Sequence, residues 1–81
     1  MIKIRFLGHL ATHFNEEIKL SGKVSVAELL NKLSHNEGGL QITRSNTLIL
    51  VNGVEVSALD GEQTEVKDDD VVTLVPISHG G

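Results

Sequence analysis

Apolar and polar residues alternate in two stretches near the start of the chain. The first stretch covers residues 2–7 (IKIRFL), and the second covers residues 17–20 (EIKL). An extended chain places successive side chains on opposite faces, so a period of two is typical of a half-buried strand. The sequence therefore predicts two strands that pair as a hairpin through a longer loop, which begins at Gly8 and is largely polar.

A helix is predicted over residues 26–35. Its apolar residues follow the period of a helix and form one stripe: Val26, Leu29, Leu30 and Leu33. Ser25 and Glu28 have the spacing of a capping box, in which each side chain accepts a hydrogen bond from the backbone of the other. Asn36 and the pair Gly38-Gly39 supply a stop signal. Because this apolar face has to be buried, we expect the helix to pack on a sheet.

Two further stretches are almost wholly apolar and β-branched. They are residues 47–51 (TLILV) and residues 71–75 (VVTLV), and Pro76 closes the second one. Such composition is typical of strands in the interior of a sheet. Asn52-Gly53 follows the first stretch, and residues 54–56 (VEV) alternate after it, which together are a strong signal for a tight hairpin.

The predicted order of elements is β-β-α-β-β-β. Residues 40–46 show no firm period, and residues 58–70 are polar and acidic. We interpret the chain as an α+β roll in which one main helix packs on one face of a mixed sheet of four to five strands. Residues 1–76 form a single domain in this interpretation, with the last strand inside the sheet, and residues 77–81 form a flexible tail.

Composition narrows the range of functions. The chain has 81 residues, which is enough for one thin core but not for a deep active site. It contains no cysteine, which excludes disulfides, thiolate metal sites and a thiol nucleophile. Eleven acidic residues against seven basic ones argue against a direct nucleic-acid partner. No apolar run has the length of a membrane span or a secretory signal, so we expect a soluble cytoplasmic protein, and a monomer.

The tail has an unusual ending. Beyond Pro76 the chain reads ISHGG, and its last two residues carry no side chain. Proline cannot donate a hydrogen bond to a neighbouring strand, so the strand is expected to end there. A segment that ends in two glycines is narrow enough to enter a slot that excludes any residue with a Cβ atom. An incidental, frayed terminus is the plainer interpretation of the same residues.

The whole chain resembles the ubiquitin-like sulfur carriers and modifiers, which have the β-grasp fold. The resemblance rests on the order of elements, the capped helix, the turn of residues 66–71 and the terminal Gly80-Gly81. The family includes the small subunit of molybdopterin synthase, the thiamine-pathway sulfur carrier, the archaeal small modifiers and the ubiquitin-related modifier. The ending, with His79 before the glycines, is most similar to the ubiquitin-related modifier. One departure is Asp68-Asp69-Asp70, where the family often has Asp-Gly-Asp.

This resemblance implies a carrier protein and not an enzyme. A separate activating enzyme would use ATP to adenylate the carboxylate of Gly81, and Gly80 would allow the tail to enter that enzyme. A sulfur donor protein would then convert Gly81 to a thiocarboxylate, or the acyl group would pass to a lysine of a target protein. A sulfur-accepting synthase is a further implied partner, with tRNA, molybdopterin and thiamine as open destinations. The carrier itself would bind no cofactor.

A partner-binding face is expected beside the tail. On the last strand Thr73 shares a face with Val75, and the polar side chain of Thr73 suggests that this face points outward. The resemblance adds Leu50 (and Leu48 as an option) on the neighbouring strand, together with Ile77 and His79 in the tail. The alternative is that the apolar residues among them belong to the core or are scattered over the surface. Arg5 either borders this face or is simply a solvated charge.

Other candidate sites are weaker. His9 and His13 are four residues apart, but they lie in a predicted loop without a third ligand, so we predict no metal site there. Asp68-Asp70 lacks the glycine and distal glutamate of an EF-hand loop, which favours a solvated turn. The lysines that could accept a further copy of the protein are not ranked: Lys3, Lys19, Lys23, Lys32 and Lys67. The alternative function is a noncovalent β-grasp interaction module with an incidental tail.

Overall fold

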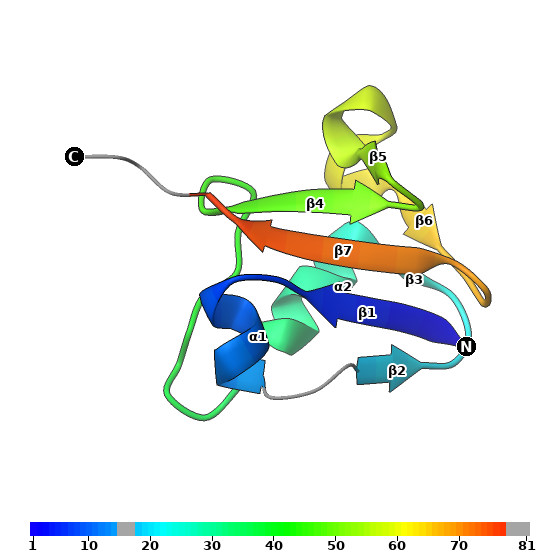
Figure 1. The fold of residues 1–81 in the computed structure, drawn as a ribbon. Coiled ribbons are helices and arrows are strands. Elements are labelled where there is room, and N and C mark those ends of the chain that lie inside the picture. Colours follow the sequence, from blue (N-terminus) through cyan, green and yellow to red (C-terminus); the bar gives the residue numbers. More distant parts are fainter. Residues whose placement is uncertain (15–17, 78–81) are drawn as a thin grey trace.

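A computed structural model describes residues 1–14 and 18–77 of the chain. Its main sheet has five strands in the order β2-β1-β7-β4-β5 (Figure 1). Strands β1 and β7 are parallel and the other neighbours are antiparallel, so the sheet is mixed, as predicted. The last strand lies in the centre, which was also predicted. The strands are β1 (Ile2–Phe6), β2 (Ile18–Leu20), β4 (Thr47–Val51), β5 (Val54–Glu55) and β7 (Val71–Pro76).

The main helix, α2 (Val26–Leu33), begins with the predicted capping box. Ser25 Oγ accepts a hydrogen bond from Glu28 N at 3.1 Å, and Glu28 Oε1 accepts one from Ser25 N at 3.4 Å. The helix ends two residues before the predicted end, so that part of the prediction is wrong. The reason lies in Asn36, whose side-chain Nδ2 donates to the carbonyl oxygens of Leu33 and Leu40 and turns the chain away.

A short helix, α1 (His9–Phe14), occupies the segment that we predicted to be a loop, so the loop prediction is wrong. Leu10 on this helix is 2% exposed, and the ring of Phe14 stacks on that of Phe6 with 4.3 Å between centroids. His9 and His13 therefore lie on a helix. A signal for it was available, because Leu10 and Phe14 are four residues apart and fall on one helical face.

The β4–β5 hairpin turns at Asn52-Gly53 as predicted, with φ values of 51° and 84° at these residues. The second strand ends at Glu55, one residue earlier than predicted, because a 3₁₀ turn begins at Val56. The segment that follows contains three short elements that the sequence did not indicate, since two or three residues are too few to show a period. They are the 3₁₀ turns η1 (Val56–Ala58) and η2 (Gly61–Gln63), and β6 (Glu65–Val66), which pairs with β3 (Val24–Ser25).

The core lies between α2 and one face of the main sheet. It consists almost entirely of aliphatic side chains, as the scarcity of aromatic residues predicted: Ile2, Ile4, Phe6, Leu10, Val24, Val26, Leu29, Leu30, Leu33, Ile42, Ile49, Val51, Val56, Val66, Val72 and Leu74. Figure 1 is viewed from the opposite face, with α2 behind the sheet. That face is not covered by α2. Across the described ranges, no helix combines the length and hydrophobicity needed to cross a bilayer.

The acidic residues before β7 stabilise a turn. Asp70 Oδ2 accepts a hydrogen bond from Lys67 N and Asp70 Oδ1 accepts one from Asn52 Nδ2, both at 2.9 Å. These two bonds, that from Lys67 first, lower the pKa of the Asp70 carboxyl. Asn52 Oδ1 in turn accepts a hydrogen bond from Val71 N at 2.9 Å. The turn and the Asn52-Gly53 hairpin are thereby joined at the start of β7.

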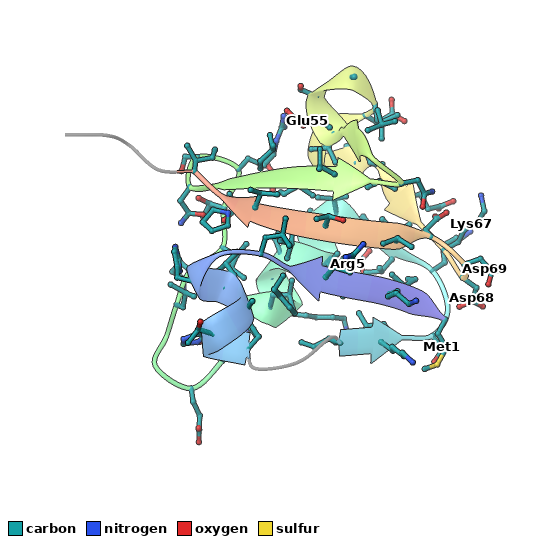
Figure 2. The ribbon with its side chains drawn as sticks, viewed as in Figure 1. Met1, Arg5, Glu55, Lys67, Asp68 and Asp69 are labelled. Carbon is teal, nitrogen blue, oxygen red and sulfur yellow. The ribbon has the colours of Figure 1, made fainter. Side chains whose placement is uncertain are left out.

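The same turn holds the start of the chain. Asp68 Oδ1 lies 3.5 Å from the amino nitrogen of Met1 and accepts a hydrogen bond from Gly22 N at 3.1 Å. The backbone N–H of Asp69 donates to the carbonyl oxygen of Met1 at 3.1 Å. Figure 2 shows Met1 close to Asp68 and Asp69. Each of the three aspartates therefore has a structural contact.

We expect Asp69→Gly to stabilise the fold by about 0.5 kcal/mol. Asp69 has φ of 76°, in the left-handed region, where a residue with a Cβ atom is less stable than glycine. Its backbone N–H bond to Met1 survives the change, whereas glycine also gains freedom in the unfolded chain, which limits the effect. Urea unfolding measures the difference. Asp68→Gly is the matched control: it loses two contacts without relieving a positive φ, so it should destabilise. A lower stability of Asp69→Gly would contradict the prediction.

Candidate functional site

An apolar patch lies on the open face of the sheet. Leu48 on β4 is opposite Val75 on β7, and Leu50 is opposite Thr73. Residues directly opposite in an antiparallel pair share a face, so these four side chains are neighbours. Leu48 is 36% exposed, and the other three are half-buried. We call Leu48, Leu50, Thr73 and Val75 the sheet patch.

The sheet patch exists because β7 is apolar on both of its faces. Val72 and Leu74 are 0% exposed and pack into the core, while Thr73 and Val75 between and beyond them point to the open face. The predicted outward direction of Thr73 and Val75 is therefore confirmed. Leu50 also lies on this face, as expected. That these residues bind a partner stays a prediction.

Cationic side chains border the sheet patch along β1 and β2. Arg5 is opposite Thr73, so it lies on the open face next to the patch, as Figure 2 shows. Lys3 and Lys19 are directly opposite each other on β1 and β2, and both are exposed. The β1 side of the open face therefore carries positive charge in a protein whose net charge is −4. Because like charges that lie opposite each other destabilise a strand pair, this arrangement lowers the stability of the sheet.

A carboxylate borders the sheet patch on the other side. Glu55 on β5 is opposite Leu50. Its carboxylate accepts hydrogen bonds from Ser57 N at 2.7 Å and from Ser57 Oγ at 2.8 Å. The bond from the backbone of Ser57, then that from its side chain, and the nearby Arg44 lower the pKa of Glu55. The open face is thus positive toward β1, whereas toward β5 the carboxylate of Glu55 lies near the cationic side chain of Arg44.

The sheet patch leads toward the tail. Ile77 follows Pro76 at the end of β7, is 39% exposed, and lines a cavity of about 340 Å³ together with Leu48, Arg44 and Glu55. The described part of the chain ends at Ile77. The predicted site residues His79, Gly80 and Gly81 lie outside the described residues, so their roles stay predictions.

His13 has a structural contact. Its Nε2 lies 2.8 Å from Asn36 Oδ1. Asn36 Oδ1 also accepts a hydrogen bond from Leu40 N while its Nδ2 donates to two carbonyl oxygens, which fixes the orientation of the amide. Nε2 of His13 must therefore donate, and the bond joins α1 to the segment after α2. Within residues 1–14 and 18–77, no group of three or more histidine, aspartate or glutamate side chains is placed to hold a metal.

Comparison with known proteins finds a matching family model and several similar solved structures. The chain matches the model of the ThiS family over residues 4–81. Small archaeal modifier protein 1 of Methanosarcina acetivorans is similar with a TM-score of 0.77 and 25% identity, over 99% of this chain and 95% of that one. Urm1 of Sulfolobus solfataricus is similar with a TM-score of 0.69 and 26% identity, over 93% of this chain and 99% of that one.

A third relative was solved with a partner. In the complex of subunits 1 and 2 of the molybdopterin-converting factor of Helicobacter pylori, the similar chain gives a TM-score of 0.63 and 29% identity, over 99% of this chain and 97% of that one. No curated protein sequence matches the chain. The family match extends from β1 through the last glycine, and the similar structures share the mixed sheet and main helix of the ubiquitin-like β-grasp fold. The chain therefore belongs to the ThiS family, among the ubiquitin-like sulfur carriers and modifiers.

Proposed function

We propose that this protein acts as a sulfur carrier or protein modifier through the carboxylate of Gly81. The observation that carries the proposal is the family match, which runs through residue 81 and includes the terminal Gly80-Gly81. A free carboxylate is anionic at neutral pH and a poor electrophile. It has to be activated before a nucleophile can attack it.

The proposed activation takes place in a separate enzyme. A Gly81 carboxylate oxygen attacks the α-phosphate of ATP, which releases pyrophosphate and leaves an acyl-adenylate. Hydrosulfide supplied by a donor protein then attacks the acyl carbon and displaces AMP, and loss of a proton leaves a thiocarboxylate. Attack by a lysine amine, with loss of a proton, gives an isopeptide bond instead. The chain contains no cysteine, so its own share of this chemistry is the acyl carbon of Gly81.

We propose that the sheet patch, extended by Ile77 and His79, docks on the activating enzyme. Apolar side chains on a sheet face that α2 does not cover support this role. The patch also lies on β7, which leads directly to the tail. The related molybdopterin-converting factor was solved as a complex of its two subunits, which shows that a protein with this fold binds a protein partner. The positive charge along β1 would favour one orientation of docking.

The alternative is a noncovalent interaction module. The sheet patch lies on β4 and β7 and needs no tail, so a partner that covers it would bind a chain without Gly80 and Gly81 equally well. The two functions differ in one respect: in the module the C-terminal carboxylate never changes.

The deciding experiment is mass spectrometry of the intact protein. The protein is incubated with an activating enzyme of the family, ATP and a sulfur donor, and we expect its intact mass to gain the mass difference of sulfur for oxygen. Omission of ATP is the control and should leave the mass unchanged. A protein that binds the enzyme but forms no adenylate, thiocarboxylate or lysine conjugate would support the noncovalent module instead.

A further inference from the structure

The last described residues of β7 are held on one side by the loop before β4. Pro76 is opposite Thr47, the last pair of the β4–β7 ladder. One more hydrogen bond lies beyond this pair, in which the backbone N–H of Ile77 donates to the carbonyl oxygen of Asn46 at 2.9 Å. The chain is therefore still fixed by its backbone at the residue from which the tail begins.

The side chain of Asn46 holds that carbonyl in place. Asn46 Oδ1 accepts hydrogen bonds from Thr43 N at 2.9 Å and from Thr47 Oγ1 at 2.7 Å, and Asn46 Nδ2 donates to the carbonyl oxygen of Gln41 at 2.9 Å. The backbone N–H of Thr47 also donates to the carbonyl oxygen of Thr43 at 2.9 Å. These bonds join the irregular segment before β4 into one unit, and the Ile77 bond attaches the end of β7 to it.

Gly8 lies against the same end of β7 on the side of β1. The backbone N–H of Leu7 donates to the carbonyl oxygen of Leu74 at 3.0 Å, which brings the end of β1 beside β7. Gly8 then turns the chain with φ of 57°, and a Cβ atom placed on it would lie 2.9 Å from Pro76 Cγ. Pro76 Cγ belongs to a ring that is closed onto the backbone, so beyond a change of ring pucker it moves only together with the backbone. Gly8 is thus required both by its φ and by the closeness of Pro76.

These contacts lie beyond the core. Leu74 is the last fully buried residue of β7, whereas Pro76 is half-buried and Ile77 is exposed. The contacts with Gly8 and Asn46 therefore add little burial, but they determine the direction in which the chain leaves the sheet. We call Gly8, Asn46, Pro76 and Ile77 the tail anchor.

We propose that Gly8 and Asn46 are positioning residues for the activation of Gly81, an inference that rests on the proposed function. The four residues after Ile77 span at most about 14 Å when extended. A change of direction at Pro76 would therefore move Gly81 by several ångströms relative to the docked sheet patch. Small misplacements of a reacting group reduce rates strongly, because the reaction depends on near-attack geometry. The tail anchor would supply this geometry without touching the reacting atoms.

The inference predicts that Gly8→Ala lowers kcat for adenylation of the protein about tenfold while KM for the protein stays unchanged. KM reports docking through the sheet patch, which Gly8 does not touch. Gly39→Ala is the matched control, since Gly39 has φ of 65° but its Cβ would have no atom within 4 Å. Both variants carry the strain of a positive φ, and the displacement of Pro76 is specific to Gly8→Ala. Gly39→Ala should therefore keep the kcat of the unaltered protein.

A second pair of variants tests the hydrogen bond between Ile77 and Asn46 in the tail anchor. It also provides a test of the inference if Gly8→Ala does not fold. Ile77→Pro and Ile77→Ala both remove the isoleucine side chain, but proline also removes the N–H that donates to Asn46. We expect kcat for Ile77→Pro to be about tenfold below that of Ile77→Ala at similar melting temperatures. Hydrogen exchange at the Ile77 amide is an independent readout, and it should be slow in the unaltered protein and faster in Gly8→Ala.

The outcomes separate the two claims. If the unaltered protein is not adenylated, the proposed function fails. The tail anchor is then tested by hydrogen exchange alone, and rapid exchange of the Ile77 amide in the unaltered protein would contradict it. If the unaltered protein is adenylated, equal kcat values for Gly8→Ala and Gly39→Ala, or for Ile77→Pro and Ile77→Ala, overturn the inference. The inference is supported if the first member of each pair has a lower kcat than the second member and the same KM.

Discussion

Deletion of Gly81 is expected to abolish formation of both the acyl-adenylate and the thiocarboxylate. The new terminal carboxylate would be that of Gly80, one residue short, and about 3.5 Å of reach would be lost. In an active site that holds reacting atoms at near-attack distances, such a shift leaves the carboxylate away from ATP. Pyrophosphate release in the presence of the activating enzyme measures the adenylation step directly.

The same deletion should leave the fold intact. Gly81 lies four residues after Ile77, whereas the core ends at Leu74. We expect the free energy of unfolding in urea to change by less than about 0.5 kcal/mol. Binding of the deletion variant to the activating enzyme should also persist, since the sheet patch is unaltered. Adenylation of the variant at the rate of the unaltered protein would contradict the role of Gly81.

Val75→Asp is expected to raise KM for adenylation by about tenfold to hundredfold, the size of effect seen when a central apolar contact of an interface is removed. The substitution places a carboxylate in the middle of the sheet patch, where docking would bury it without a partner. The protein should still fold, because Val75 points to the open face. Steady-state kinetics with varied carrier concentration measures KM, and circular dichroism checks the fold.

Two control substitutions show whether the rise in KM is specific to the sheet patch. Leu59→Asp adds the same charge at an exposed leucine outside the patch and should leave KM unchanged. Leu74→Asp adds it one residue away from Val75, but on the buried face, and should unfold the protein. If Val75→Asp and Leu59→Asp give the same KM, docking through the sheet patch is contradicted.

The parts of the fold that the sequence predicted are those in which a local pattern determines the structure. Ser25 and Glu28 form the capping box because their spacing alone brings side chain and backbone together. Asn52-Gly53 turns the chain because both residues tolerate positive φ. The orientation of β7 followed from the single polar residue, Thr73, within an apolar run.

The parts that the sequence did not predict depend on contacts between distant residues. Asn36, which the sequence marked as a stop signal for α2, also accepts a hydrogen bond from His13 on α1, and the sequence did not indicate this distant contact. The tail anchor requires Gly8 to meet Pro76, and no local pattern shows that residues so far apart are in contact. The side-chain bonds of Asn46 likewise become informative once Ile77 is seen to donate to its carbonyl.

The parallel pairing of β1 with β7 has a consequence for the synthesis of the protein. Residue 3 pairs with residue 71, so β1 gains its central neighbour only after β7 has been synthesised. Pairing across such a separation is intrinsically late in folding. A nascent chain that stops before residue 71 lacks half of the sheet patch as well as the tail. An activating enzyme that docks on β7 would therefore not bind a chain that lacks this strand, and it would consume ATP and sulfur only on chains in which the sheet is complete.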